Sequence, residues 1–290
     1  MPTILLRAEA GDRPPDVLLV EDPEHALHAV ALLDGGQPGS ELISDHRGLP
    51  AFRGRRKGQP VTIQTTGLGA PAVAMVVEEL LMTGARRFLR VAPAMAVTPS
   101  LQEGAAVVAM SASAIDGTTR TYLGGLQLAP TADFGLTTAL VRSAHAAGVR
   151  LQVGSVATVD VLPDDAARRE LAACGILAAD LGTAPLFVLA AREDAKAPTV
   201  DARVLAAAIL WIDASVAGGH PAASTASLDA LLRVALDALS GRREPSSMPA
   251  EDVSRSGRHR PLQLPLPRGP VRASGGRRPH PRCGRSSSRG

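Results

Sequence analysis

Several ionisable side chains of this chain could carry chemistry at the ends of its predicted strands. Glu21 and His25 follow an apolar strand over residues 16–20. A histidine beside a carboxylate can serve as a general base, although a histidine at the start of a helix is more often simply solvated. Arg47 and Arg90 could bind an anion or pair with nearby carboxylates, and the residues alone favour neither role.

Two aspartates are further candidates for acid–base chemistry, together with His25. Asp160 follows a strand predicted over residues 151–156, and Asp180 precedes an apolar segment that predicts a helix. A carboxylate in the position of Asp180 can instead cap the helix, and that structural role is the better interpretation. The two cysteines offer no metal-ligand spacing, so no metal site is expected.

The stretch over residues 61–97 must position these side chains, because it predicts a complete β-α-β unit. Val61 begins a run of β-forming residues, which a Thr-Thr-Gly-Leu-Gly turn follows directly. Pro71 suits the first turn of a helix, and Gly84 ends that helix before a second strand over residues 87–91. In α/β folds, ligands bind at the carboxyl edge of the sheet, where this turn lies.

The other segments alternate between strand and helix patterns, which predicts an α/β fold with a parallel or mixed central sheet flanked by helices. Thr131 is expected to cap one of these helices, and Ser224 or Thr225 another. The remaining predicted elements are a helix over 25–33, a hairpin through Lys57 and Gly58, a strand over 105–110, helices over 131–147, 166–174, 181–192 and 226–239, and apolar segments over 199–204 and 207–212, either of which could be a strand.

Composition separates the chain into two parts. Residues 241–290 hold 12 arginines and 3 acidic residues, whereas the net charge of the whole chain is only +3. Pro, Arg, Ser and Gly dominate this basic tail, and such a composition predicts disorder. The domain is therefore predicted over residues 1–240. The tail lacks aromatic residues, so no specific binding of nucleic acid is expected.

The length and hydropathy of the chain indicate a protein of the cytoplasm. The 290 residues are 45% hydrophobic, yet no run of about 18 apolar residues could span a membrane. The amino-terminal residues 1–15 carry charges where a signal peptide needs an apolar run. Neither a membrane partner nor secretion is therefore expected.

The chain resembles the nucleoside phosphorylase superfamily, which holds uridine phosphorylase and bacterial-type purine nucleoside phosphorylase. The resemblance runs from about residue 8 to residue 239 and implies the three-layer phosphorylase/hydrolase-like fold. Five ordered segments carry it: AEAGDRPPDVLLVEDPEHA, SDHRGLPAFRG, TTGLGAPAVAMVVEELLMTGARRFLRV, ADFGLTTALVRSAHAAGV and CGILAADLGTAPLFVLAA.

By this resemblance, the phosphate site differs from the family pattern. The family has Gly-Asp-Pro-x-x-Arg after its first strand, where this chain has Glu21 in place of the glycine and His25 in place of the arginine. Arg47 and Arg90 match the two other phosphate arginines, the first of which crosses a dimer interface in the family. Pro93 stands in a turn that normally supplies a hydroxyl and a backbone N–H.

The sugar and base sites differ as well. The family's Glu-Met-Glu ribose clamp corresponds to Asp180, Leu181 and Gly182, which removes the second carboxylate, and Leu162 stands where the base pocket usually has an aromatic residue. The proton-donating aspartate of purine phosphorylases aligns with Leu205.

These changes favour a non-phosphorolytic family member that binds a nucleoside-like or other small ligand. The alternatives are an active pentosyltransferase or nucleosidase that cleaves an N-glycosidic bond, and an enzyme repurposed to another small molecule. No cofactor is expected, and inorganic phosphate would be a co-substrate only if phosphorolysis is retained. The resemblance also implies a homo-oligomer, or a mixed oligomer with an active paralogue.

Overall fold

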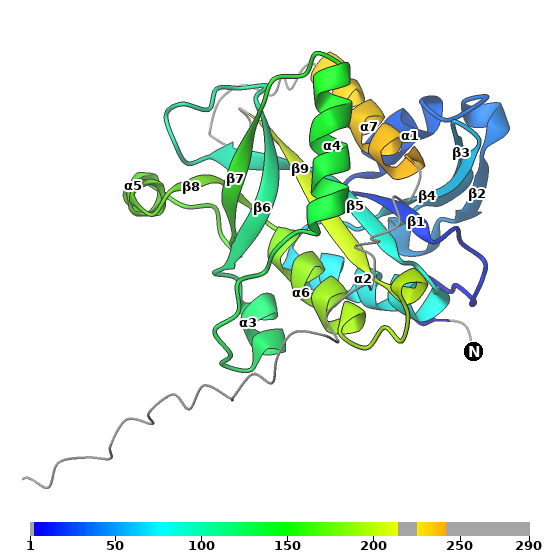
Figure 1. Ribbon diagram of the computed structural model, residues 1–290, viewed down its shortest axis with the longest axis horizontal. Coiled ribbons are helices and arrows are strands. Elements are labelled where there is room, and N and C mark those ends of the chain that lie inside the picture. Colours follow the sequence, from blue (N-terminus) through cyan, green and yellow to red (C-terminus); the bar gives the residue numbers. More distant parts are fainter. Residues whose placement is uncertain (1–2, 214–224, 242–290) are drawn as a thin grey trace, which may run out of the picture. The chain divides into compact units, whose positions relative to one another are not determined.

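The computed structural model describes residues 3–213 and 225–241, which belong to one compact unit (Figure 1). The basic tail and the proposed cap Ser224 lie outside the described residues. A mixed sheet with helices on both faces forms this unit, which confirms the predicted fold class. No helix in the described ranges is both long and apolar enough to cross a membrane.

Nine strands form the sheet, in the order β2-β3-β4-β1-β5-β8-β7-β6-β9. The strand β9 pairs with β6 and also, in parallel, with β5, so five of the strands close into a ring. The strands are β1 (Asp16–Val20), β2 (Glu41–Ser44), β3 (Ala51–Arg56), β4 (Gln59–Thr65), β5 (Arg87–Ala96), β6 (Ala106–Ala114), β7 (Leu151–Thr158), β8 (Ile176–Asp180) and β9 (Leu205–Ile212).

Helices cover both faces of the sheet, as Figure 1 shows. The α-helices are α1 (Pro23–Ala31), α2 (Ala70–Thr83), α3 (Gly117–Leu123), α4 (Phe134–Ala146), α5 (Asp165–Ala173), α6 (Thr183–Asp194) and α7 (Thr225–Ser240); the 3-10 turns are η1 (Gln37–Gly39), η2 (His46–Gly48) and η3 (Val200–Ala202). One apolar cluster joins α2 and α6 to the sheet, and another joins α1, α4 and α7 to its opposite face.

Strand β1 shows why its sequence is apolar throughout. Val17 and Leu19 pack into the cluster with α2 and α6, whereas Leu18 and Val20 pack into the cluster with α1 and α7. Successive side chains of a strand point to opposite faces, so a strand covered on both sides needs a continuous apolar run.

The predicted β-α-β unit is confirmed as β4, α2 and β5. Gly84 ends α2 with a φ of 107°, a left-handed conformation that glycine adopts without steric cost. Strand β5 continues beyond the predicted end at residue 91, because its second half pairs with both β8 and β9.

Some local predictions were wrong. Asp133, and not Thr131, caps α4 by accepting a hydrogen bond from the backbone N–H of Leu136 at 2.8 Å. Thr131 instead forms a β-bridge with Ser111. Residues 200–202 form the turn η3, while residues 207–212 lie in β9, and neither β8 nor α3 was predicted.

Candidate functional site

A buried cluster of three charged side chains lies where the first strand of the β-sheet ends. Glu21 follows β1 directly, Arg90 lies beside Leu19 on the adjacent strand β5, and Asp180 ends β8. Arg90 is 0% exposed, Glu21 5% and Asp180 1%. The Nη2 atom of Arg90 donates a hydrogen bond to Oε1 of Glu21 and lies 3.4 Å from Oδ2 of Asp180.

Strand alternation explains why Arg90 reaches this position. Arg90 shares its face of β5 with Phe88 and Ala92, which belong to the apolar cluster with α2 and α6. Its guanidinium is therefore directed to the side of the sheet that α2 and α6 cover, where it lies beside Gly182. An arginine in the middle of a buried strand needs charged partners, and Glu21 and Asp180 provide them.

Asp180 holds the start of α6 in place, although the N-cap residue itself is Gly182 and not Asp180. Its Oδ2 accepts hydrogen bonds from the backbone N–H groups of Gly182 at 3.1 Å and Thr183 at 2.9 Å. The Thr183 hydroxyl also donates to Oδ2, at 2.6 Å, and the Thr158 hydroxyl donates to Oδ1, at 2.7 Å. These four donors fix the Asp180 carboxylate next to Arg90.

The cluster contains two carboxylates and one guanidinium. Burial raises the pKa of Glu21, against the opposing effect of the Arg90 charge. The Nε and Nη1 atoms of Arg90 are buried without a hydrogen-bond partner among the described residues. The guanidinium thus has donor capacity left, but its charge is already matched by protein carboxylates.

Gly182 leaves no room for a side chain at its position. A Cβ atom built there would lie 2.7 Å from Cγ2 of Val73 and 3.1 Å from Nη2 of Arg90. With Val73 and Arg90 in their observed positions, a larger residue at the place of the family's second clamp carboxylate would require its neighbours to shift. Leu181, which precedes Gly182, packs against the small apolar cluster around Val159.

His25 lies against the end of β9. Its ring meets the Trp211 ring edge-on, with centroids 5.3 Å apart and an interplanar angle of 77°. Burial lowers the pKa of His25, which favours the neutral imidazole. Its Nδ1 atom has no hydrogen-bond partner among residues 3–213 and 225–241.

The other predicted site residues are not part of the buried cluster. Arg47 is exposed in η2 with a φ of 61° and forms no ion pair within the part of the chain that the structure describes. Pro93 is half-buried in β5 opposite Trp211, and Leu162 is 37% exposed. Asp160 accepts a hydrogen bond from the backbone N–H of Gly117 at 2.8 Å and so fixes the start of α3.

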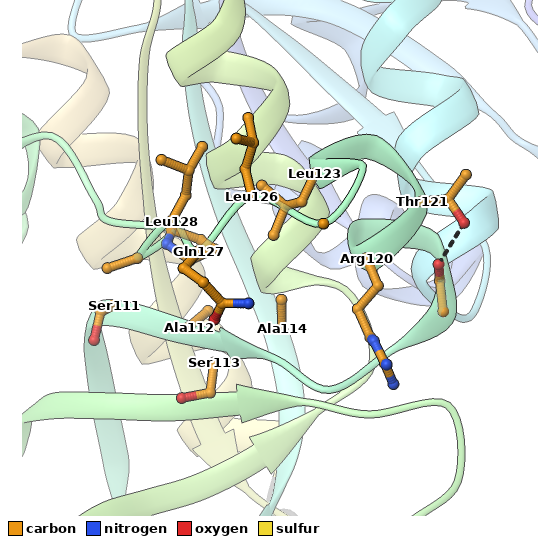
Figure 2. Close-up of a pocket in the computed structure, with 14 residues that line it drawn as sticks. Ser111, Ala112, Ser113, Ala114, Arg120, Thr121, Leu123, Leu126, Gln127 and Leu128 are labelled. Atoms are coloured by element: carbon orange, nitrogen blue, oxygen red, sulfur yellow. Dashed lines mark hydrogen bonds between the residues drawn. The ribbon is translucent and has the colours of Figure 1, made fainter. Parts of the chain in front are cut away.

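A cavity of about 790 Å³ lies between the end of β6, α3 and residues 125–130. Figure 2 shows Arg120, Gln127 and Ser113 around this space, with leucine side chains on its other side. Gly117 also lines it, which places the Asp160 contact at its border. The residues of the buried cluster do not line this cavity.

Asp213 lies at the same edge of the sheet as Glu21, and the match to the family pattern did not select it. The alignment pointed to Leu205, which begins β9, whereas Asp213 follows the carboxyl end of that strand. The backbone N–H of Asp213 donates to the carbonyl of Ala94 in β5 at 3.2 Å. Because β9 runs parallel to β5, and β5 to β1, Asp213 and Glu21 both follow strand ends at the same edge.

The sequence pattern of a known family matches most of the compact unit that contains the buried cluster of Glu21, Arg90 and Asp180. A family profile described as the phosphorylase superfamily matches residues 15–237. The chain belongs to this superfamily.

In the described residues, no group of three or more His, Cys, Asp or Glu side chains could hold a metal ion.

Individual members of the superfamily are similar over long stretches. A DeoD-type purine nucleoside phosphorylase of Exiguobacterium is 32% identical over 241 residues, which are 81% of this chain and 97% of that protein. The uridine phosphorylase of Thermococcus kodakarensis is 32% identical over 155 residues, or 53% of this chain and 54% of that protein. The crystal structure of uridine phosphorylase from Vibrio fischeri shares the fold, with a TM-score of 0.69 at 24% identity over 80% of this chain and 95% of that one.

Proposed function

We propose that this protein is a non-phosphorolytic member of the phosphorylase superfamily that binds a nucleoside-like small molecule. The observation that carries this proposal is the buried ion pair between Glu21 and Arg90. In this proposal, the Glu21 carboxylate occupies the place that inorganic phosphate takes in phosphorolytic relatives.

The charge of Glu21 supports this exclusion of phosphate. Two like unit charges about 4 Å apart repel by about 4 kcal/mol at an effective dielectric constant of 20, which corresponds to a several-hundredfold loss of affinity. Arg90 is fully buried and already paired, so it adds no free positive charge to attract an anion. Pro93 has no backbone N–H to donate.

Hydrolysis of the N-glycosidic bond is the second candidate. It requires a base that activates water, and a buried carboxyl group with a raised pKa, such as Glu21, suits that role.

We also propose that the protein works in the cytoplasm as an oligomer, alone or with an active paralogue. Light scattering of the purified protein tests for the homo-oligomer, and co-purification with the paralogue tests for the mixed oligomer.

A panel of purine and pyrimidine nucleosides tests the proposal in two measurements. Titration calorimetry should show that one of them binds, and chromatography should show no release of free base that depends on added phosphate. Release without phosphate would favour the hydrolase candidate. Release that rises and saturates with phosphate would refute the proposal.

Two substitutions at neighbouring positions sharpen the test. E21G restores the residue that the family pattern has and should introduce phosphate-dependent release of base. The matched control is D22N, which also removes one negative charge but leaves Arg90 untouched. Asn in this position still accepts the backbone N–H of Glu24, as Asp22 does at 2.7 Å, so α1 keeps its cap.

A further inference from the structure

A second cavity, of about 710 Å³, lies at the opposite end of β1. Arg13 precedes this strand and lines the cavity, whereas Glu21 follows the strand. Strand residues rise about 3.3 Å each, so the length of β1 separates the cavity from the buried cluster. The start of β4 and the end of α2 complete its lining, with Arg53 as a second arginine.

Arg13 is a buried arginine, and two of its three guanidinium nitrogens have unused donors. It is 6% exposed, and its Nε and Nη2 atoms have no hydrogen-bond partner among the described residues. Buried polar groups are normally paired with protein or with water. An arginine buried in this way needs an acceptor, and the cavity that it lines has room for one.

The nearby carboxylates do not fill this need. Asp12 and Glu79 are the acidic groups whose charges act on Arg13. Oδ2 of Asp12 accepts the backbone N–H of Glu9 at 2.7 Å. Glu79 accepts three backbone N–H groups of the amino-terminal segment, from residues 4, 5 and 6. Asp12 also lines the cavity, but neither carboxylate forms a hydrogen bond with Arg13 in the part of the chain that the structure describes, and both charges help to keep Arg13 protonated.

We propose that this cavity binds a small oxyanion, the phosphate or carboxylate group of a free molecule, through Arg13. The planar guanidinium offers paired N–H donors that match the oxygens of such groups. Arg53 adds a second positive charge at the rim. Arg53 is half-exposed and pairs with Glu41 at 2.7 Å, so it can add its charge to the site while it stays paired with Glu41. The site is distinct from the buried cluster and does not depend on the function proposed for it.

Thermal unfolding of the whole protein with inorganic phosphate or with acetate tests this site. A ligand that binds only the folded state raises the melting temperature in proportion to the logarithm of its concentration. Wild type should respond to at least one of the two anions, R13Q should lose the response, and R53Q should weaken it. R150Q is the matched control, since Arg150 is exposed and lies outside the cavity. An equal response in R13Q, or none in wild type, would overturn the proposal.

A second measurement covers the case in which R13Q does not fold. Crystals of wild type soaked with tungstate, a heavy oxyanion, should show anomalous density within hydrogen-bond distance of Arg13. Tungstate bound elsewhere with an empty Arg13 cavity would contradict the site.

Discussion

The carboxylate of Glu21 and the guanidinium of Arg90 form an ion pair that is almost wholly buried, and Asp180 holds the same guanidinium from another strand. Glu21 follows β1, Arg90 lies within β5 and Asp180 is the last residue of β8, so the cluster links elements that are distant in the sequence. Loss of one partner would leave a buried charge without compensation. Such losses cost about 3–5 kcal/mol in proteins.

The first prediction concerns the pH dependence of stability through Glu21. Because burial raises the pKa of Glu21, the folded state holds the proton more tightly than the unfolded state does. The resulting stabilisation is fully present below the unfolded pKa of about 4.3 and is lost as the pH rises through the folded pKa. Urea unfolding at a series of pH values should therefore show this loss in wild type.

The same unfolding series in two variants identifies the group. E21Q cannot titrate and should remove this part of the pH dependence, whereas D22N should retain it. If E21Q and wild type lose stability in parallel over the whole series, Glu21 is not the titrating group.

The second prediction concerns the space beside Gly182. G182A should destabilise the protein by about 1–3 kcal/mol, because the new methyl group would meet Val73 and Arg90 at less than ordinary contact distance. A double-mutant cycle with V73A checks the cause. V73A should reduce the cost of G182A, and strictly additive free energies of unfolding would show that Val73 does not restrict this position.

The third prediction compares two aspartates at the starts of helices. D180N should lower the free energy of unfolding by about 3 kcal/mol, because it removes the negative charge that pairs with Arg90 and replaces one of the two accepting oxygens of Asp180 by an NH₂ group. D164N removes only the charge of the cap of α5, whose Oδ1 accepts the N–H of Ala167, and should cost about 1 kcal/mol or less. Equal costs would mean that the ion pair contributes nothing at Asp180.

The fourth prediction concerns His25. Since burial lowers the pKa of His25, its contribution to stability is present above the unfolded pKa of about 6.5 and is lost as the pH falls through the folded pKa. H25Q should remove this acid-side loss of stability, while H145Q on the exposed end of α4 should keep it. An NMR titration of the His25 ring that gives an ordinary or raised pKa would contradict the assignment.

Sequence patterns predicted those parts of the fold whose apolar residues have a clear period and whose ends carry Gly or Pro. The unit of β4, α2 and β5 has both signals. Strand β8 follows Gly175 but has no clear period, since its five residues contain three alanines or leucines that suit a helix equally well. Helix α3, with the sequence GTTRTYL, lacks an apolar period and is instead started by Asp116, whose Oδ1 accepts the N–H of Thr119.

The candidate site shows a similar limit. The sequence supplied Glu21 and Arg90 as neighbours in a predicted site, with pairing as one of two roles, but only strand register places them in contact. It gave no indication of Arg13, because an arginine before two prolines is common at surfaces. Arg13 is buried, and it shares the lining of its cavity with the end of α2 and the start of β4, which are distant in the sequence.

The double pairing of β9 has a consequence for the order of events in biosynthesis. This strand is the last of the sheet to be translated, yet it lies between β5 and β6, which emerge from the ribosome much earlier. Until residue 212 is available, both earlier strands keep unpaired backbone edges, and such edges favour association with other chains. Nascent chains that stop before β9 should therefore depend on chaperones, while β2, short and exposed, is the one edge strand that the described sheet retains after completion.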